Sequence, residues 1–402
     1  MKILVVNLGS TSLKYRLFEF GAGREAVLAR GGFERVTDHG AAIASCLAAL
    51  KEAGALVDPR ELAAVGFKAV IARGVSGCVR VDQAVLEGLE AYRGIAPVHN
   101  PVYARGMREF ARRMPDTPLI ALFETAFYQW VPEAAGRYAV PEAWFEAGVR
   151  RFGFHGASHK YIAERSAELL GRPDVAERAR RLYLDGPAAP LAGPDLRVVS
   201  CHLGGSSSVT GIRSGVAIGT SMGMSPQSGL PQNDRVGDLD AMALPYVVNA
   251  LGLSLEEAAL ALSGQGGLKA LSGGLNDIRD IEAAAARGEG RARLALEVLV
   301  HETRRYVGSF LLELDGLDAL VFTGGIGENS AAVRAGVCAR LERLGVALDP
   351  KMNQAAKAAE ATLSTPEARV KVLVIPANEE LVVAREARRF LEAHSPQPPK
   401  GS

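Results

Sequence analysis

A strand–turn–strand pattern occurs twice in this chain, once at its start and once in its second half. The first copy covers residues 2–18, where an apolar run and a second, alternating run flank the polar turn 7–12. The second covers residues 196–219, where "LRVVSCHLGGSSSV" continues as "TGIRSGVAIG". Alternating and β-branched runs separated by a short turn of small polar residues predict β-hairpins. Because the same hairpin recurs, we expect duplicated halves that face each other.

Helical stretches lie between and after the two hairpins. The segment "SHKYIAERSAELLG" predicts a helix that begins at the N-cap residue Ser158 and ends at Gly171, and residues 296–310 keep apolar side chains at helical spacing. The combination predicts a mixed α/β fold. Residues 172–195 contain four prolines and little periodicity, so we expect an inserted surface loop there.

The charge and the cysteine content narrow the classes of function. The chain has 402 residues, a net charge of +1 and 48% hydrophobic residues, which is typical of a globular protein with two or more domains. A near-neutral charge favours a small-molecule partner over nucleic acid or a membrane. The four cysteines lie far apart without metal-binding spacing, and the N-terminal apolar run 3–6 is too short for a signal peptide or a membrane span. We therefore expect a cytoplasmic protein.

Turns rich in glycine and hydroxyl side chains are candidate phosphate-binding loops. They contain Asn7, Ser10, Ser12 and Lys14 in the first hairpin, His202, Gly204, Gly205 and Ser206 in the second, and the segment 322–330, "FTGGIGENS", before a predicted helix. Small residues let backbone N–H groups approach a phosphate closely. Taken alone, the first turn is more simply interpreted as a polar hairpin turn. The occurrence of such turns three times in one chain favours a nucleotide site.

Some polar residues stand out by their positions. His99 in "APVHNP" and His155 in "RFGFHGASH" lie in glycine- and proline-rich stretches, where a histidine that only satisfies loop backbone is the simpler alternative. Arg235 in "QNDRVGDLD" can bridge two anions or form a surface ion pair. Glu124 and Glu379 follow apolar runs, where carboxylates cap helices or hold Mg²⁺ with bound phosphate. We favour the magnesium interpretation slightly.

Taken in order, these motifs resemble those of the acetate kinase family, the short-chain carboxylate kinases of the actin, sugar kinase and Hsp70 superfold. The matching segments are "NLGSTSLKY", "PVHNP", "ETAFYQ", "RFGFHGASHKYIAER", "CHLGGSSS", "TSMGMSP", "LNDIRDI", "FTGGIGENS" and "VIPANEEL". The resemblance implies an α/β fold of two duplicated actin-like (ribonuclease-H-like) ATPase domains around a nucleotide cleft. It also implies transfer of the γ-phosphoryl group of ATP to a carboxylate such as acetate or propionate, a requirement for Mg²⁺, and a homodimer.

The two hairpins and the helices between them suggest domain limits. We expect domain I to cover residues 1–149 plus 377–402, and domain II to cover 150–376 with the inserted loop near 172–195.

Roles for individual residues follow from the same resemblance. We expect His155, Arg235, Glu124 and Lys68 in catalysis, with His99 and His202 nearby, and Asn7, Glu124 and Glu379 on the magnesium side. The residues expected to contact ATP or ADP are Lys14, Ser10, Ser12, His202, Gly204, Gly205, Ser206, Asp277, Arg279, Gly325, Ile326 and Gly327. The apolar pocket for the acyl chain would comprise Val70, Val98, Phe154 and Pro226, beside His99.

The chain departs from the family at several of these positions. Where the family reads HRVVHGG, this chain reads "FKAVIARG", so that Lys68 takes the place of an arginine and Ile71 that of a histidine. Lysine cannot hold a carboxylate or phosphoryl group bidentately as guanidinium does. Glu124 replaces an aspartate, "HLGGS" replaces HLGNG at Gly205, and "NDR" replaces GTR.

These departures leave alternatives to an ordinary carboxylate kinase. One is a paralogue that uses a different carboxylate acceptor or another phosphoryl donor such as pyrophosphate. Another is a weakly active nucleotide-binding protein.

Overall fold

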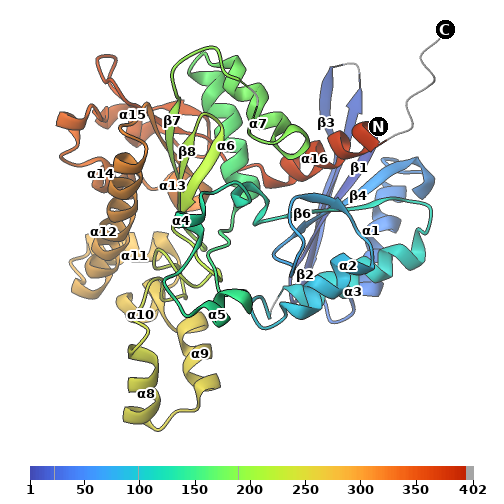
Figure 1. Ribbon diagram of the computed structural model, residues 1–402, viewed down its shortest axis with the longest axis horizontal. Coiled ribbons are helices and arrows are strands. Elements are labelled where there is room, and N and C mark those ends of the chain that lie inside the picture. The colour runs from blue at the N-terminus through green and yellow to red at the C-terminus, as the bar shows by residue number, and fades with distance from the viewer. Residues whose placement is uncertain (22, 98, 189, 395–402) are drawn as a thin grey trace.

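The computed structural model describes residues 1–21, 23–97, 99–188 and 190–394, which form two mixed sheets with helices packed around them (Figure 1). The first sheet has the strand order β3-β2-β1-β4-β6-β5, with bounds Arg24–Glu34, Ser12–Gly21, Lys2–Leu8, Leu62–Ala69, Leu119–Phe123 and Cys78–Arg80. The second has the order β9-β8-β7-β10-β12-β11, with bounds Val216–Thr220, Ser208–Arg213, Arg197–His202, Ala319–Thr323, Lys371–Val374 and Ala361–Thr362.

The helices cover both sheets and connect them. Their bounds are α1 His39–Glu52, α2 Gln83–Ala91, α3 Asn100–Arg113, α4 Glu133–Gly136, α5 Glu142–Glu146, α6 Gly156–Leu169, α7 Pro173–Asp185, α8 Ala243–Leu251, α9 Leu255–Gly264, α10 Gly267–Ser272, α11 Ile278–Ala286, α12 Gly290–Glu313, α13 Gly324–Asn329, α14 Ala331–Cys338, α15 Pro350–Ala355 and α16 Glu379–His394.

The two sheets repeat one topology, as the recurring hairpin predicts. In the first, β1 pairs antiparallel with β2, β2 pairs antiparallel with β3, and β1 pairs parallel with β4, which pairs parallel with β6. In the second, β7, β8, β9, β10 and β12 pair in the same order and directions. Each sheet ends with an antiparallel strand, β5 or β11. This confirms the expected α/β fold with two duplicated halves.

Alternating burial explains how the second sheet is covered on both faces. Successive side chains of a strand point to opposite faces. Accordingly Val199 packs in the cluster that contains Leu299 and Phe310 of α12, whereas Val198 packs with Ile162 of α6. The predicted helix over 296–310 lies within α12 and is confirmed.

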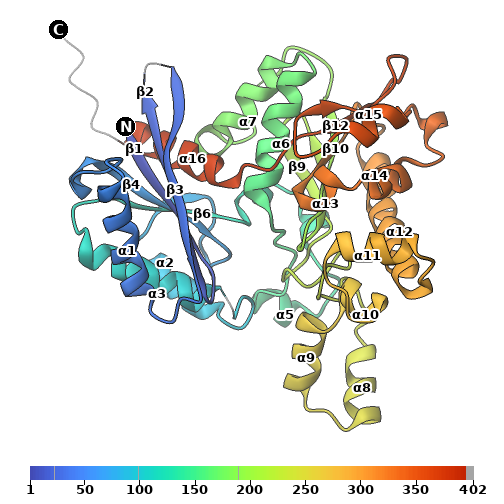
Figure 2. The ribbon, with the colours of Figure 1, turned by 180° about the vertical axis from the view of Figure 1, so that it is seen from behind.

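The C-terminal helix α16 packs on the first sheet, although it follows the last strand of the second. Val382, Val383, Ala384 and Ala387 share a buried cluster with β1, β4 and β6. Figures 1 and 2 show α16 extending from the second sheet back across the first. This packing supports the grouping of the C-terminal segment with domain I; the exact domain limits remain a proposal.

Two local predictions are wrong. The expected loop at 172–195 is helical over Pro173–Asp185, where Pro173 occupies the first turn and buried Val175, Ala179 and Leu182 hold helical spacing. The arginines that obscured this periodicity lie on the other face and pair with carboxylates. The helix α6 begins at Gly156, not Ser158, whose hydroxyl bonds to His202 instead of capping.

The helices α8 and α9 form an arm that projects from the body (Figure 1). Its large apolar side chains are mostly exposed: Met242 71%, Tyr246 72%, Leu251 69%, Leu255 63% and Leu260 61%. Within the described ranges no single helix has the length and apolarity to cross a bilayer, and only α8 and α9 together, bent by 116°, meet that criterion.

Candidate active site

A lysine and two carboxylates meet where the neighbouring parallel strands β4 and β6 of the first sheet end. Lys68 lies near the end of β4, Glu124 directly follows the parallel neighbour β6, and Glu379 is the first residue of α16. The Lys68 Nζ atom is 2.7 Å from Glu379 Oε2 and 3.1 Å from Glu124 Oε1. Burial would lower the pKa of Lys68, but the two carboxylates outweigh it and raise that pKa well above its usual value. Lys68 is therefore a fixed cation.

The carboxylates retain unused oxygens. Glu124 Oε2 and Glu379 Oε1 are buried and have no hydrogen-bond partner in the described part of the chain. Burial, together with the nearby charge of Glu379, raises the pKa of Glu124 despite Lys68. Burial acts in the same direction on Glu379, but Lys68 and His202 hold the pKa of Glu379 below its usual value.

Two carboxylates that share one ammonium and each keep a free oxygen fit a hard divalent cation such as Mg²⁺. The third expected ligand, Asn7, uses its Oδ1 to accept from the Tyr103 hydroxyl at 2.9 Å. No cluster of three or more His, Cys, Asp or Glu side chains suited to a metal occurs among the described residues. Any cation here would thus share Glu124 and Glu379 with Lys68.

A cluster of histidines lies at the start of α6 and the end of β7, on the side of the second sheet. The rings of His155 and His202 stack with centroids 4.3 Å apart. His155 Nδ1 is 2.8 Å from Ser208 Oγ, His202 Nδ1 is 2.8 Å from Ser158 Oγ, and His159 contacts both Ser200 and Ser208. Burial, followed by the charges of neighbouring histidines, Lys68 and Arg235, lowers the pKa of His155 well below its usual value. His155 is thus neutral at neutral pH.

The backbone around His155 holds it in an uncommon conformation. Its φ is 59°, in the left-handed region that costs energy for a residue with a Cβ. Gly156 follows, and its backbone N–H donates to the Glu124 carbonyl oxygen at 2.9 Å. A Cβ at Gly156 would lie 2.3 Å from that oxygen, so only glycine lets α6 begin beside Glu124. This contact joins the histidine cluster to the carboxylates.

Arg235 completes the basic side of the site. Its Nη1 donates to Gln232 Oε1 at 3.2 Å and lies 3.4 Å from Ser206 Oγ. Burial, then the charges of Arg235 and Lys68, lowers the pKa of His99. The long side-chain contacts of Arg235 leave most of its donors for an anion.

The second and third turns lie against each other. Leu203 O accepts from the backbone N–H groups of Ile326 at 2.8 Å and Gly327 at 3.0 Å. Gly324 has a φ of 76°, and a Cβ there would lie 2.7 Å from Leu203 O. The structure therefore brings Gly204, Gly205 and Ser206 beside Gly325, Ile326 and Gly327, as two adjacent nucleotide turns require.

Other residues that were expected to contact the nucleotide lie outside the cluster of histidines and carboxylates. Lys14 pairs with Glu34 at 3.6 Å and its side chain is 63% exposed. Asp277 caps α11 and pairs with Arg279, whose side chain is 84% exposed. The first turn is a tight hairpin in which Gly9 N–H donates to Ser12 O at 2.9 Å, with Ser10 exposed. These residues are accessible to a ligand but do not contact the buried cluster.

The expected acyl pocket corresponds to a small apolar cluster. Phe154 is buried with Ile71, Ala96 and Met222, and Val70 packs against them. Pro226 accepts at its carbonyl from Gln232 Nε2 at 2.6 Å. Val98 lies outside the described residues.

The sequence reasoning missed several supporting residues. Tyr103 binds Asn7, Ser208 binds His155 and His159, and Gln232 joins Arg235, Ser206 and Pro226. Ser208 lies opposite His202 in the β7–β8 register. Pairing the two strands of the predicted second hairpin would have identified Ser208 as a neighbour of the histidines.

The chain resembles known proteins over nearly its whole length. A family model, the acetokinase family, matches residues 32–385. The acetate kinases of Geobacillus kaustophilus and Natranaerobius thermophilus are 38% and 39% identical to it, over 97% of this chain and 99% and 100% of theirs. Among solved structures, Porphyromonas gingivalis acetate kinase superposes with a TM-score of 0.85 at 32% identity, covering 97% of this chain and 99% of that one. A Francisella tularensis propionate kinase gives 0.80 at 30%, covering 96% and 98%.

Proposed function

This chain belongs to the acetokinase family, and from that premise we propose that it is an ATP-dependent kinase that converts a short-chain carboxylate, acetate or propionate, to its acyl phosphate. The observation that carries the proposal is the contact of Lys68 with Glu124 and Glu379, each of which keeps an unpaired oxygen, at the point where Gly156 joins the His155–His202 stack to Glu124. Phosphoryl transfer depends on positioning and on neutralising charge more than on covalent chemistry, and this cluster supplies both.

We assign the following roles. Neutral His155, whose Nδ1 is engaged by Ser208, presents Nε2 as a hydrogen-bond donor to the transferring phosphoryl group. Arg235 offers its free guanidinium donors to the same oxygens. Lys68 neutralises the carboxylate side of the site. Mg²⁺, held by Glu124 and Glu379, would neutralise phosphate charge on ATP.

A coupled assay with ATP tests the proposal on acetate, propionate and butyrate. We expect turnover with acetate or propionate, and absence of turnover with all three acids would refute the proposal. Repeating the assay with pyrophosphate as donor, and following thermal shift by nucleotide, separates the alternatives of another donor and of a weakly active binding protein. The comparisons favour neither alternative.

Lys68 and Glu124 form one contact, so we predict that they are coupled. The family has an arginine at the position of Lys68 and an aspartate at the position of Glu124. In this chain the basic side chain has therefore lost its guanidinium group, and the acidic side chain is one methylene longer. We expect Lys68→Arg and Glu124→Asp each to lower kcat/KM for acetate by about tenfold, and the double variant to recover most of the loss. A sharp rise in acetate turnover in either single variant would instead favour a paralogue with another acceptor.

We also propose a homodimer that forms through the arm α8–α9. Apolar side chains exposed above 60% at Met242, Tyr246, Leu251, Leu255 and Leu260 make a surface of the kind that subunit contacts cover. We expect light scattering to give twice the chain mass, and Tyr246→Glu or Leu260→Glu to give the monomer. The matched control is Leu312→Glu, since Leu312 on α12 is 78% exposed outside the arm. A monomeric wild-type protein would contradict the proposal.

The remaining expectations stay predictions. A cytoplasmic location can be tested by cell fractionation. The division into residues 1–149 plus 377–402 and 150–376 can be tested by limited proteolysis.

A further inference from the structure

Two helices begin at the candidate active site and come from different halves of the molecule. The helix α6 starts directly after His155 and packs on the second sheet through Ile162 and Ala163. The helix α16 starts at Glu379 and packs on the first sheet through Val382 and Val383. The placement of one helix against the other therefore sets the position of His155 relative to Glu379 and Lys68.

A buried ion pair joins these two helices behind the site. Lys160 of α6 and Glu386 of α16 are 2.6 Å apart, and their side chains are 1% and 2% exposed. The ammonium group also donates to the Arg180 carbonyl oxygen at 3.3 Å and lies 5.0 Å from the centre of the Tyr183 ring. Glu386 Oε1 additionally accepts from Arg389. Lys160 is enclosed on several sides, so it has one geometry in which to meet Glu386.

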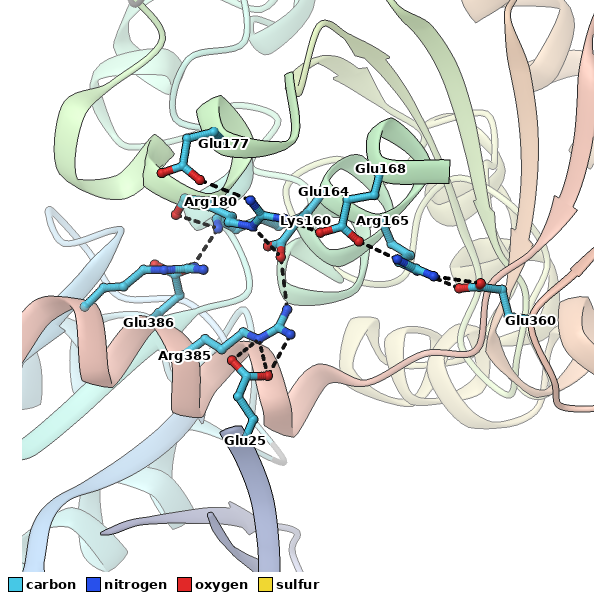
Figure 3. A network of polar contacts seen from close by, with 11 residues as sticks. Glu25, Lys160, Glu164, Arg165, Glu168, Glu177, Arg180, Glu360, Arg385 and Glu386 are labelled. Atoms are coloured by element: carbon cyan, nitrogen blue, oxygen red, sulfur yellow. Dashed lines mark hydrogen bonds and ion pairs between the residues drawn. The ribbon is translucent and has the colours of Figure 1, made fainter. Parts of the chain in front are cut away.

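Exposed pairs surround this contact. Figure 3 shows Arg385 of α16 bridging Glu164 of α6 and Glu25 of β3, and Arg180 of α7 reaching Glu164 and Glu177. The outer side chains of this rim retain solvent exposure, 33% at Glu25 and 57% at Glu177, whereas Glu164 is only 8% exposed. The contact of Arg385 with Glu164 therefore also joins α16 to α6, but Arg385 is 21% exposed and divided between Glu164 and Glu25, so it fixes the helices less firmly than the fully buried pair does.

Stability alone does not account for a buried ion pair. Withdrawing two charges from water costs about as much as their attraction returns, and apolar replacements of similar volume are often neutral or stabilising. What the pair adds is a directional contact that slipping or rotation of either helix would break. Lys160 is five residues from His155 and Glu386 is seven residues from Glu379 along their helices, so such movements would be carried directly to the site.

We propose that Lys160 and Glu386 are positioning residues that lock α6 against α16 and so hold His155 in register with Lys68 and Glu379 for phosphoryl transfer. The proposal rests on the proposed function for its kinetic consequence, but its geometric content does not depend on it. A displacement of reacting groups by about 1 Å can cost about a hundredfold in rate. Substrate binding depends on more dispersed contacts and should change less.

The test replaces both partners by apolar side chains of similar size, Lys160→Met with Glu386→Leu. We expect the double variant to fold with a melting temperature near that of the wild type, because Lys160 and Glu386 are removed together and Arg389, which also loses Glu386, is 19% exposed and can be hydrated. Its kcat should fall about 10- to 100-fold, while KM for ATP and acetate stays within about threefold. The imidazole NMR signals of His155 and His202 should shift, since the stacking of the two rings would change.

The matched control is Glu25→Gln, which removes a rim partner of Arg385 and should change neither kcat nor the histidine signals. If the double variant does not fold, Glu386→Asp, which keeps the charge but retracts it by a methylene, should show the same fall in kcat at unchanged KM. A folded double variant with wild-type kcat and unmoved histidine signals would overturn the proposal. If the wild type phosphorylates no carboxylate, the proposed function fails, and the histidine signals still decide whether the pair positions the site.

Discussion

Replacing Lys68 with methionine should lower the free energy of unfolding by about 3 kcal/mol at pH 8, because it leaves Glu124 and Glu379 facing each other without a counter-cation. We expect the lower end of the range for a broken buried pair, since the side chains of Lys68 and Glu379 remain 19% and 20% exposed. Urea unfolding at fixed pH measures the loss.

The loss should depend on pH in a defined direction. Without Lys68, burial and mutual repulsion would raise the folded-state pKa of both carboxyl groups above their unfolded values. A raised pKa means that the folded state binds more protons, so stability falls as pH rises through the folded pKa. In the wild type the pKa of Glu379 is instead lowered, so its contribution is present above the unfolded pKa and lost as pH falls. The gap between variant and wild type should therefore be larger at pH 8 than at pH 5.

Adding Mg²⁺ gives an independent check on the same variant. A cation that binds the two carboxylates should restore part of the lost stability, by mass action on the folded state. The control is Lys14→Met, because Lys14 is 63% exposed and its ion pair among the described residues is the long contact with Glu34 at 3.6 Å. Equal stability losses at pH 5 and pH 8 would contradict the assignment of Lys68 as the counter-cation.

The sequence predicted the duplicated sheets because period-two burial and small-residue turns are local signals. The strand β3 was missed, since most of its residues are exposed and its side chains do not alternate in burial. The hairpin predicted over 196–219 contains a further turn, which divides its second part into β8 and β9. The helix α7 was missed because arginines and flanking prolines obscured the spacing of Val175, Ala179 and Leu182. Burial patterns at the edge of a fold depend on neighbours that the sequence does not identify.

The residues of the candidate site also fall into those that the sequence indicated and those that it did not. Residues in conspicuous turns, such as His155 and Glu124, could be named from their motifs, whereas Tyr103 and Gln232 lie in a helix and a loop that have no local signature. Lys160 lies within a recognised segment, but nothing in that segment indicates its partner. Their roles arise from contacts between distant segments, as in the pair Lys160–Glu386. Long-range pairing of this kind is set by tertiary packing, which a single sequence does not display.

The departures from the family pattern also acquire a spatial explanation. Lys68 contacts Glu124 directly. Gly205, which lacks the family's asparagine side chain, faces Asn233 of "NDR": a Cβ at Gly205 would lie 3.5 Å from Asn233 Nδ2. Asn233 Oδ1 is buried without a partner in the described residues, so this amide can turn toward a ligand. The changes thus occur as contacting sets, in which one replacement accompanies another.

Arg235 should be the side chain whose removal lowers the rate most without lowering stability. Its bonds to Gln232 at 3.2 Å and Ser206 at 3.4 Å are long, so their loss should cost less than about 1 kcal/mol. Its charge contributes to lowering the pKa values of both His99 and His155. Burial lowers the pKa of Arg235 against the pull of Asp234, yet the group stays charged at neutral pH.

We therefore expect Arg235→Ala to reduce kcat for acetyl phosphate formation by about a hundred- to a thousandfold, because a donor aimed at the transferring oxygens is lost. Arg235→Lys keeps the charge but not the planar fork, so it should recover only part of the rate. The matched control is Arg213→Ala. Arg213 is the last residue of β8, whereas Ser208, which contacts His155, is the first. Steady-state kinetics with thermal melting separates rate from stability. A kcat within threefold of wild type in Arg235→Ala would remove Arg235 from the catalytic machinery and leave His155 and Lys68 to neutralise the transferring group.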